Sequence, residues 1–433
     1  MQDFLDRVEQ RSLNVGVVGL GYVGLPLAVA FAEAGFKVTG VDVNDVRVSG
    51  LNAGDSYIAD VADGPLAAQV EAGRLRATTD ASVIAELDAV VICVPTPLSK
   101  TRDPDVSYIL AAADQVSKHF HPGMLVVMES TTYPGTTEEV LLPSLQANGM
   151  EAGRDFYLAF SPERIDPGNK KYTLTNTPKI VGGITPVCGD IAAAFYGTIC
   201  SQVHRVSSCR AAEMVKLLEN TFRAVNIALV NEVAMMCERL EIDSWDVIEA
   251  AATKPFGYMP FYPGPGLGGH CIPVDPHYLT WKLRTLDYQA RLVELASVIN
   301  AAMPEHVVRL VADALNDATK SVRGSRILVH GIAYKRDIDD VRESPALDII
   351  RLLAARGAEV SYFDPFVPEV SEGLEEPMRS LTGGPEICAD YDCVVVCTDH
   401  TDIDWQAVID ASPLIIDTRN ITSGRDDPHI VRL

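Results

Sequence analysis

The sequence lacks any apolar run approaching the roughly 18 residues that a membrane-spanning helix needs. Its first residues lack the basic segment followed by an apolar stretch that is typical of a secretory signal. Basic residues are few relative to acidic ones, 36 against 59, and the formal net charge of -23 disfavours nucleic acid and anionic membranes as partners. We therefore expect a cytoplasmic protein that binds neither, although local backbone N–H groups can still hold a phosphorylated small molecule.

The nine cysteines include no CxxC pair and no His/Cys spacing typical of a zinc site. We therefore expect reduced thiols and no bound metal. Hydrophobic residues make up 47% and charged residues 22% of the chain, which is typical of a folded globular protein. A length of 433 residues predicts two or three domains, each with its own core.

Short β-branched runs alternate with helical stretches in the first half of the chain. A strand is expected at residues 13–18, a helix at 25–34 and a second strand at 37–41. This alternation predicts a mostly parallel, doubly wound sheet. Further strands of the same kind are expected at 89–94, 125–128 and 156–160.

One long helix is predicted between residues 211 and 240, where apolar side chains recur every three or four positions. At 1.5 Å per residue it would be about 45 Å long, so it is expected to link two domains and to offer a dimer interface. Strand patterns return at 326–330, 359–363, 393–397 and 414–417, and residues 392–400 echo residues 88–97. The expected fold is α/β: two Rossmann-like domains joined by a central helical domain.

The first predicted strand is followed by Gly19, Gly21 and Gly24, in the spacing GxGxxG. Between a strand and a helix, such a turn lets backbone N–H groups and the helix dipole face a pyrophosphate. Asp42 ends the next strand, where a carboxylate accepts the ribose hydroxyls and repels a 2'-phosphate. We therefore predict bound NAD rather than NADP. The further candidates for contacts with the cofactor are Tyr22 and Val23 in the turn, Pro95, Thr96, Ser130 and Thr131 after strands, and Arg342.

Cys271 follows a stretch crowded with Gly264, Gly266, Gly268 and Gly269, which leaves room for a closely packed ligand. The other cysteines fit the ordinary role of small buried hydrophobes. Lys216 and Asn220 are four residues apart on the predicted long helix. From spacing alone, solvated polar side chains fit Lys216 and Asn220 better than a site does. The same alternative holds for Glu163, Asp275, Lys335 and Arg342.

Taken together, these motifs resemble those of the UDP-glucose/GDP-mannose dehydrogenase family along the whole chain. The matching segments are GlyLeuGlyTyrValGlyLeuPro (19–26), ValProThrPro (94–97), SerProGlu (161–163), Lys216 with Asn220, GlyGlyHisCys (268–271) and TyrLys (334–335). The resemblance implies an NAD-binding domain at 1–205, a central helical domain at 206–320 that carries the catalytic cysteine and dimerises, and a UDP-sugar-binding domain at 321–433. It also implies a homodimer or a higher homo-oligomer.

The resemblance further implies a four-electron oxidation at C6 of a UDP-sugar, in which Cys271 forms a thiohemiacetal and then a thioester. Lys216, Asn220, Asp275 and Glu163 would be the other catalytic residues. The implied substrate-binding residues are Glu163, Arg164, Lys216, Asn220, Gly266, Gly268 and Lys335.

GlyGlyHisCysIleProValAsp and ThrAspHis (398–400) look like the N-acetylhexosamine branch, and residues 261–270 most resemble UDP-N-acetylglucosamine 6-dehydrogenases of bacterial polysaccharide pathways. Enzymes for UDP-ManNAc, UDP-GalNAc and UDP-glucose remain alternatives. Two other classes stay open: a single-step hydroxyacid dehydrogenase, which needs no nucleophilic cysteine, and a non-catalytic NAD-sensing protein.

Overall fold

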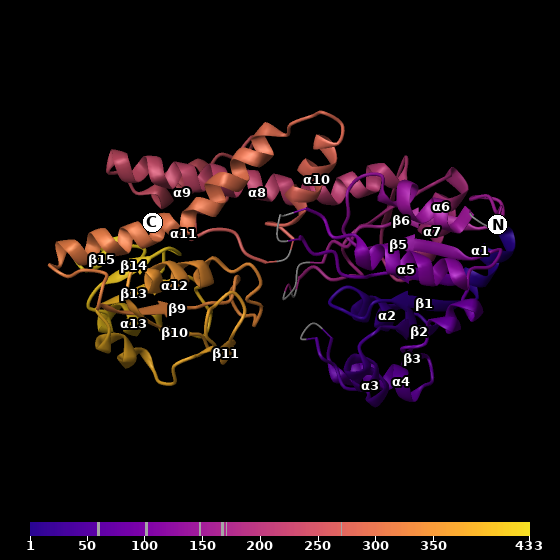
Figure 1. Cartoon of the computed structure of the whole chain (residues 1–433), viewed down its shortest axis with the longest axis horizontal. Helices are drawn as coiled ribbons and strands as arrows, with labels where there is room; N and C mark the ends of the chain where they lie inside the picture. The colour runs from indigo at the N-terminus through magenta and orange to yellow at the C-terminus, as the bar shows by residue number, and fades with distance from the viewer. Residues whose placement is uncertain (59–60, 100–102, 147–148, 166–168, 170, 270) are drawn as a thin grey trace. The chain divides into compact units, whose positions relative to one another are not determined.

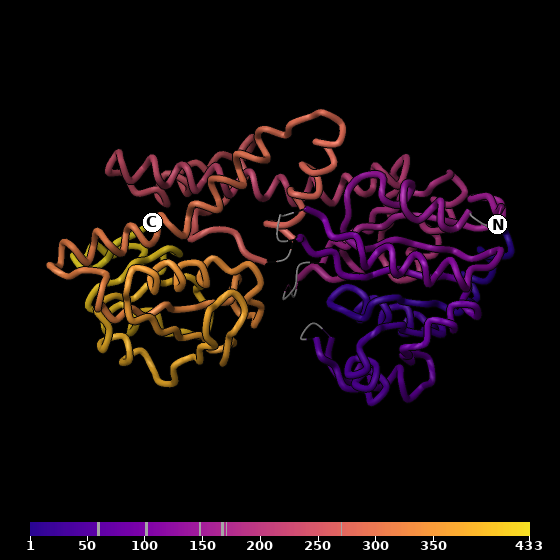
Figure 2. The backbone as a smooth tube through the Cα atoms, viewed as in Figure 1, coloured from indigo at the N-terminus to yellow at the C-terminus, as the bar shows by residue number. Residues whose placement is uncertain are grey.

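The computed structural model describes the chain except residues 59–60, 100–102, 147–148, 166–168, 170 and 270 (Figure 1). The chain divides into two compact units, one of residues 1–219 with 277–287 and one of residues 220–276 with 288–433. The backbone can be followed through both units in Figure 2. Helix α8 (Cys209–Leu240) contributes to both, as predicted for the long helix.

The first unit is built on an eight-stranded sheet in the order β3-β2-β1-β4-β5-β6-β7-β8. Neighbouring strands are parallel except that β7 runs antiparallel to β6. The strand order reverses between β1 and β4, the position at which doubly wound sheets bind ligands at the carboxyl ends of their strands. The strands are β1 (Asn14–Val18), β2 (Lys37–Val41), β3 (Leu75–Thr78), β4 (Ala89–Ile92), β5 (Leu125–Met128), β6 (Tyr157–Phe160), β7 (Lys179–Gly183) and β8 (Val203–Val206).

The inner strands of this sheet are almost wholly buried, because helices cover it. Helix α2, for example, is apolar on nearly every side and packs on β1 and β2. The helices are α1 (Gln2–Glu9), α2 (Gly24–Glu33), α3 (Asp45–Ala53), α4 (Asp63–Glu71), α5 (Ser107–Lys118), α6 (Leu142–Gln146) and α7 (Pro186–Tyr196), with a 3-10 turn η1 (Ala81–Glu86) and a π-helical turn η2 (Thr137–Leu141).

The second unit has a five-stranded sheet in the order β10-β9-β13-β14-β15, in which every pair is parallel. The parallel sheet expected in this half of the chain is thus confirmed. Helix α11 (Arg291–Asp317) packs against α12 and the sheet. The other elements of this unit are α9 (Ser244–Ala252), β9 (Arg326–His330), α12 (Pro345–Ala355), β10 (Glu359–Phe363), β11 (Glu369–Val370), β12 (Met378–Arg379), η3 (Pro385–Asp390), β13 (Cys393–Val396), α13 (Trp405–Ala411), β14 (Ile415–Asp417) and β15 (Ile430–Arg432). Helix α10 (Asp275–Arg284) begins in this unit and belongs to the first unit from residue 277 on.

The two sheets share a pair of hydrogen bonds made by an aspartate, which accounts for the similarity in sequence between residues 88–97 and 392–400. Asn14 and Asp88 exchange two hydrogen bonds of 2.8 Å, one to the carboxylate of Asp88 and one from its amide. Arg326 and Asp392 exchange the same two bonds at the same lengths. In both sheets an aspartate therefore anchors the start of one central strand beside the start of its neighbour.

Part of the predicted apolar stripe of α8 is exposed on this chain. In the second unit, Phe222 is 46%, Leu229 55%, Met236 49% and Leu240 65% exposed. Among the described residues, no helix combines the length and apolarity needed to cross a bilayer.

Candidate functional site

The turn after β1 gives each of its three glycines a different task. Gly19 has φ +91°, and a Cβ there would lie 2.6 Å from the carbonyl oxygen of Cys93. A Cβ on Gly24 would lie 1.8 Å from the carbonyl oxygen of Gly19, so this glycine allows the helix to approach the strand. A Cβ on Gly21 would meet no atom within 4 Å. The open side of the turn is therefore at Gly21, where a pyrophosphate can approach the backbone.

Asp42 follows β2 and is fixed by the turn. Its Oδ2 accepts a 2.7 Å hydrogen bond from the amide of Leu20, and its Oδ1 accepts a 2.9 Å bond from the amide of Asn44. Each carboxylate oxygen keeps a lone pair for a ribose hydroxyl. Nη1 of Arg47 lies 3.6 Å from Oδ2. The turn and this carboxylate suit NAD.

The other predicted cofactor residues lie at the carboxyl ends of neighbouring strands or in the turn. Ser130 follows β5 and is buried, and its Oγ donates to the carbonyl of Ile92. Thr96 follows β4 and is buried, and its carbonyl accepts a 2.9 Å bond from the hydroxyl of Tyr278. Within the same unit, Tyr22 and Pro95 are exposed and Val23 and Thr131 are half-buried.

Glu163 follows β6 and is 8% exposed. Its Oε1 accepts hydrogen bonds of 2.7 Å from the amides of Arg164 and Ile165. Nζ of Lys216 donates a 2.8 Å bond to the carbonyl oxygen of Glu163. The guanidinium of Arg164 binds the carboxylate of Glu219 at 2.5 Å. Three of the predicted residues of the first unit, 163, 164 and 216, thus lie together, and Lys216 is buried instead of solvated.

Glu163 also belongs to a buried ionic cluster that sequence reasoning missed. Nζ of Lys179 contacts Oε1 of Glu129 and lies 3.3 Å from Oε2 of Glu163. The hydroxyl of Tyr196 donates a 2.5 Å bond to Oε2 of Glu129. The one signal in the sequence was the carboxylate of Glu129 directly after an apolar strand, because that position faces the ligand edge of a parallel sheet.

Cys271 is the only one of the nine cysteines that is not fully buried. Its carbonyl accepts a 2.9 Å bond from the amide of Asp275 at the start of α10. Burial raises the thiol pKa of other cysteines and keeps them protonated, which makes them poor nucleophiles. This holds for Cys93, Cys200, Cys209, Cys388, Cys393 and Cys397.

Asn220 and Asp275 form a buried pair in the second unit. The side-chain amide of Asn220 donates to Oδ2 of Asp275, and the two residues are 5% and 0% exposed. Asn220 is therefore not a solvated residue of α8, which was the reading that spacing alone favoured. Cys271 lies four residues before Asp275 in the sequence. Cys271, Asp275 and Asn220 therefore all belong to the second unit, and Asp275 is linked by hydrogen bonds to both of the others.

The glycines before Cys271 have a structural reason of their own. A Cβ on Gly268 would lie 2.5 Å from Cβ of Tyr334, and one on Gly266 would lie 3.0 Å from Cβ of Pro345. The loop therefore needs glycine for its close packing on residues 331–345. Lys335 and Arg342 lie on that segment and are half-buried, and the Nε and Nη2 atoms of Arg342 bind the carboxylate of Asp340 at 2.6–3.1 Å.

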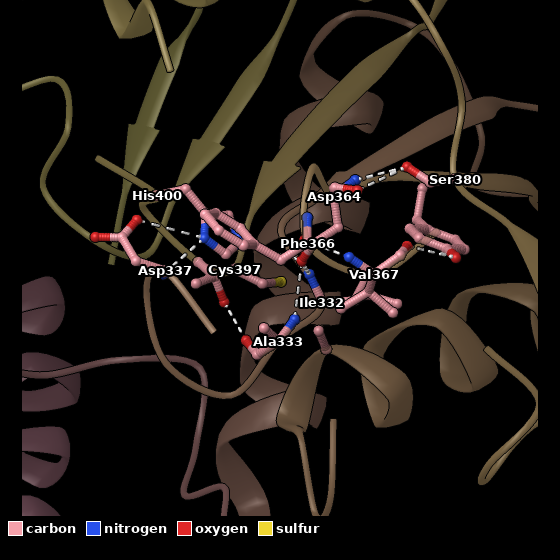
Figure 3. Close-up of polar contacts among 12 residues, drawn as sticks. Ile332, Ala333, Asp337, Asp364, Phe366, Val367, Ser380, Cys397 and His400 are labelled. Atoms are coloured by element: carbon pink, nitrogen blue, oxygen red, sulfur yellow. Dashed lines mark hydrogen bonds and ion pairs between the residues drawn. The ribbon is translucent and has the colours of Figure 1, made fainter. Parts of the chain in front are cut away.

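The turn after β9 repeats the turn after β1, with a different outcome. Asp364 follows β10 as Asp42 follows β2, and its Oδ2 accepts a 2.7 Å bond from the amide of Ile332 (Figure 3). In this copy, Nε2 of His400 lies 3.1 Å from the same oxygen, and Nδ1 accepts a 2.9 Å bond from the amide of Asp337. Because Nδ1 is an acceptor, Nε2 of His400 carries the N–H group and donates a hydrogen bond to Oδ2 of Asp364. The Asp364 carboxylate, which occupies the position of Asp42, the residue predicted to bind the ribose, is therefore already hydrogen-bonded to the protein's own groups.

Four consecutive residues after β13 hold the segment that carries Lys335. Thr398 donates to the carbonyl of Ala333, Asp399 pairs with Arg336, and both His400 and Thr401 bind Asp337. Figure 3 shows His400 between Asp337 and Asp364. The ThrAspHis motif is thus a structural clamp on residues 333–337.

Comparison with known proteins identifies the family. The sequence matches the UDP-glucose/GDP-mannose dehydrogenase family in its NAD binding domain at residues 13–200, its central domain at 210–302 and its UDP binding domain at 328–424. A UDP-N-acetyl-D-glucosamine 6-dehydrogenase of Pseudomonas aeruginosa is 36% identical over 394 residues, 90% of this chain and 92% of that protein. A UDP-N-acetyl-D-mannosamine dehydrogenase of Salmonella typhi is 37% identical over 402 residues, 89% and 93% of the two chains.

The fold agrees with these similarities. The solved structure of a UDP-D-ManNAc dehydrogenase from Pyrococcus horikoshii superimposes with a TM-score of 0.88 at 33% identity, covering 97% of this chain and 99% of that one. The chain therefore belongs to the UDP-glucose/GDP-mannose dehydrogenase family and is an NAD-dependent nucleotide-sugar dehydrogenase.

Proposed function

We propose that this enzyme oxidises C6 of a UDP-N-acetylhexosamine to the carboxylate, with UDP-N-acetylglucosamine as its substrate. Relatives of similar identity are named for UDP-N-acetylglucosamine and for UDP-N-acetylmannosamine. The choice between them rests on the segment from Phe261 to Cys271 and its resemblance to the glucosamine enzymes. Residues 1–205 would hold the cofactor, 206–320 the reacting groups and 321–433 the UDP.

The exposure of Cys271 carries the proposal of a covalent route. An alcohol loses one hydride to become an aldehyde, and the aldehyde must become tetrahedral before a second hydride can leave. A thiolate that adds to the aldehyde gives a thiohemiacetal, loss of hydride leaves a thioester, and water then releases the acid and the thiol. NAD supplies the hydride acceptor in both oxidations, so two NAD are reduced per substrate. Among the nine thiols, only Cys271 is half-buried and the others are buried, and the carbonyl of Cys271 accepts a hydrogen bond from the amide of Asp275.

We assign roles to the other predicted residues from the family resemblance and from the contacts that each makes within its own unit. Lys216 spends one of its three N–H donors on the carbonyl of Glu163, so two remain for an oxyanion. Asn220 would donate to an oxyanion and hold Asp275, and Asp275 would position or deprotonate water. Glu163 would assist hydrolysis, and Arg164, Gly266, Gly268 and Lys335 would bind the UDP-sugar. Arg342 would contact cofactor phosphate.

The test is NADH production measured at 340 nm with UDP-GlcNAc, UDP-GalNAc, UDP-ManNAc and UDP-glucose offered separately. Two NADH per molecule of UDP-GlcNAc, with a higher kcat/KM than for the other sugars, is the expected result. Two NADH per molecule, with a higher kcat/KM for another sugar, would identify that sugar as the substrate and would still support the four-electron mechanism. One NADH per substrate would favour a single-step dehydrogenase.

The covalent route has its own test in Cys271→Ser, with Cys237→Ser as a matched control on a buried thiol. The Cys271 variant should bind NAD normally but fail to release acid at the normal rate. Mass spectrometry of acid-quenched wild-type enzyme should show the uronyl adduct on the peptide that contains Cys271. Normal acid formation by Cys271→Ser would rule out the thioester.

A further inference from the structure

Strand β7, which runs antiparallel to β6, brings an unexpected lysine to the candidate site. Glu129 directly follows β5, and Glu163 lies three residues beyond the end of the parallel strand β6. Strand β7 is antiparallel to β6, with Phe160 opposite Gly182 and Ala159 opposite Gly183. Continuing that register places Lys179, the first residue of β7, opposite Glu163. The start of β7 thus lies at the edge of the sheet where β5 and β6 end.

Lys179 bridges the two carboxylates that meet at this edge. Its Nζ contacts Oε1 of Glu129 and lies 3.3 Å from Oε2 of Glu163. The Lys179 side chain is 3% exposed and that of Glu129 is 0% exposed. The hydroxyl of Tyr196 from α7 holds the other oxygen of Glu129 at 2.5 Å. Both oxygens of Glu163 are therefore held, one by backbone amides and the other by Lys179.

Burying the charged side chains of Lys179, Glu129 and Glu163 costs free energy, so a gain in stability is a weak explanation for this cluster. Two carboxylates and one ammonium carry a surplus negative charge, and replacing buried ion pairs by apolar side chains is often neutral or stabilising. The charge on Glu163 depends on neighbours from several elements. These are Lys179 from β7, Glu129 after β5, Tyr196 from α7 and Lys216 from α8, and the thiols of Cys93 and Cys200 lie within the electrostatic reach of the pair.

The pKa values of the Glu129 and Glu163 carboxyl groups are shifted in opposite directions. Burial raises the pKa of Glu129 to about 7, against the opposing effect of Lys179. Burial also raises the pKa of Glu163, but Lys179, a hydrogen bond from Glu129, the Ile165 amide and Lys216 outweigh it and hold this pKa below its ordinary value. Near neutral pH, Glu129 can keep the cluster's shared proton while Glu163 stays ionised.

We propose that Lys179 and Glu129 are positioning residues of this dehydrogenase, which fix the carboxylate of Glu163 and set the pH at which it ionises. The proposal rests on the role assigned to Glu163 in hydrolysis. Neither residue needs to touch substrate, because each acts through Glu163. Both residues stabilise the charged form of Glu163, Lys179 by its positive charge and protonated Glu129 by a hydrogen bond.

Two substitutions should therefore move the acidic limb of the kcat–pH profile to higher pH. Lys179→Met leaves two buried carboxyl groups without their cation, so the limb should move to higher pH by about one unit or more. Glu129→Leu removes the hydrogen-bond donor, so the limb should also move to higher pH, whereas Glu129→Gln keeps a neutral donor and should leave it in place. Asp190→Asn breaks an ion pair whose two side chains are each 42% exposed, and it should leave the limb in place.

Glu163→Gln separates this proposal from the proposed function. Loss of the acidic limb in Glu163→Gln shows that the limb belongs to Glu163, and shifts to higher pH in Lys179→Met and Glu129→Leu then support the proposal. Unchanged limbs in Lys179→Met and Glu129→Leu would overturn it and leave the role of Glu163 intact. An acidic limb that persists in Glu163→Gln would overturn both. If Lys179→Met does not fold by circular dichroism and NAD binding, Glu129→Leu alone still decides, because a shift to lower pH or none contradicts the proposal.

Discussion

The side-chain amide of Asn220 donates a hydrogen bond to the carboxylate of Asp275, and both residues are buried in the second unit. A buried carboxylate that loses such a donor becomes less suited to stay charged and in place. We expect Asn220→Ala to lower kcat about 100-fold, which is typical for loss of one donor in an active site. Steady-state kinetics at saturating NAD and UDP-sugar check this.

Asn226 provides the control, because it lies on the same helix and its side-chain amide binds the carbonyl of Phe222 away from that pair. Asn226→Ala should change kcat by no more than about twofold. An equal loss in both variants would mean that α8 itself had been disturbed, and that the Asn220–Asp275 bond has no special part in turnover.

Two glycines of the same turn should respond differently to alanine. Gly21→Ala places a methyl group where nothing lies within 4 Å, so folding should be unaffected and the Kd for NAD should rise. Gly24→Ala places a Cβ 1.8 Å from the carbonyl oxygen of Gly19, and we expect it to cost about 1–3 kcal/mol of stability or more. Urea unfolding and NAD titration on both variants separate the two effects. Equal destabilisation would contradict the open side assigned to Gly21.

Asp42 should decide between NAD and NADP. Asp42→Ser keeps an acceptor for the amide of Leu20 and removes the negative charge, while Arg47 remains beside the site to bind a phosphate. The ratio of kcat/KM for NADP to that for NAD should rise about tenfold or more, because a like charge at about 4 Å costs roughly 1–4 kcal/mol. Adding Arg47→Ala should abolish the gain. An unchanged ratio would show that Asp42 does not face the ribose.

The cofactor turn could be predicted from the sequence because its residues are close together along the chain. Gly19, Gly21 and Gly24 lie within six residues, and Asp42 ends the very next strand. The local rules of strand, glycine turn and helix are then sufficient to assign their positions. The same holds for the long helix, whose periodicity extends over its whole length.

The cluster around Lys179 could not be predicted in this way. Its position depends on the direction of β7, and a short run such as LysIleValGlyGly has no feature that distinguishes a parallel from an antiparallel strand. Lys216 and Asn220 posed a similar difficulty, since burial of a polar side chain depends on segments distant in sequence. The glycines before Cys271 pointed to a ligand, but the side chain of Tyr334 already explains why Gly268 is needed.

Acid should weaken the second unit through His330. Burial lowers the pKa of this 2% exposed side chain to about 4, and His400 adds to the effect. The unfolded chain takes up the proton near pH 6.5, so acidification from 6.5 to 4 favours unfolding, by about 3 kcal/mol in all. His330→Phe, between the rings of Phe363 and Trp405, should flatten the pH dependence of the unfolding free energy in that window. Urea unfolding from pH 4 to 8 measures it.

The exposed His204 serves as a control for that experiment. His204→Gln should leave the pH dependence of the unfolding free energy unchanged. A slope in His330→Phe equal to that of the wild type would assign the acid sensitivity to other groups.

We propose that the exposed apolar surface of the second unit binds a second copy of the chain. It comprises Phe222, Leu229, Met236 and Leu240 on α8 and Leu292, Leu295 and Val298 on α11, each 46–66% exposed. Apolar surface of this kind is typical of an obligate interface. Light scattering should give twice the chain mass of 46.8 kDa for the wild type and the single mass for Leu229→Glu. Leu110→Glu, on an exposed leucine of α5, should remain dimeric. A wild type of single mass would refute the interface.

The first unit is not continuous along the chain, because residues 277–287 return to it after the second unit has begun. Within residues 277–287, Tyr278 is fully buried and its hydroxyl donates a hydrogen bond to the carbonyl of Thr96, in the loop that follows β4. A chain growing on the ribosome emerges amino end first, and amino-terminal domains usually fold before the rest is made. Here the last strand of the sheet, β8, ends at Val206, and more than sixty further residues must be synthesised before Tyr278 can bind the loop that follows β4. Until then the nascent protein has a nearly complete cofactor domain that lacks one of its fixing points.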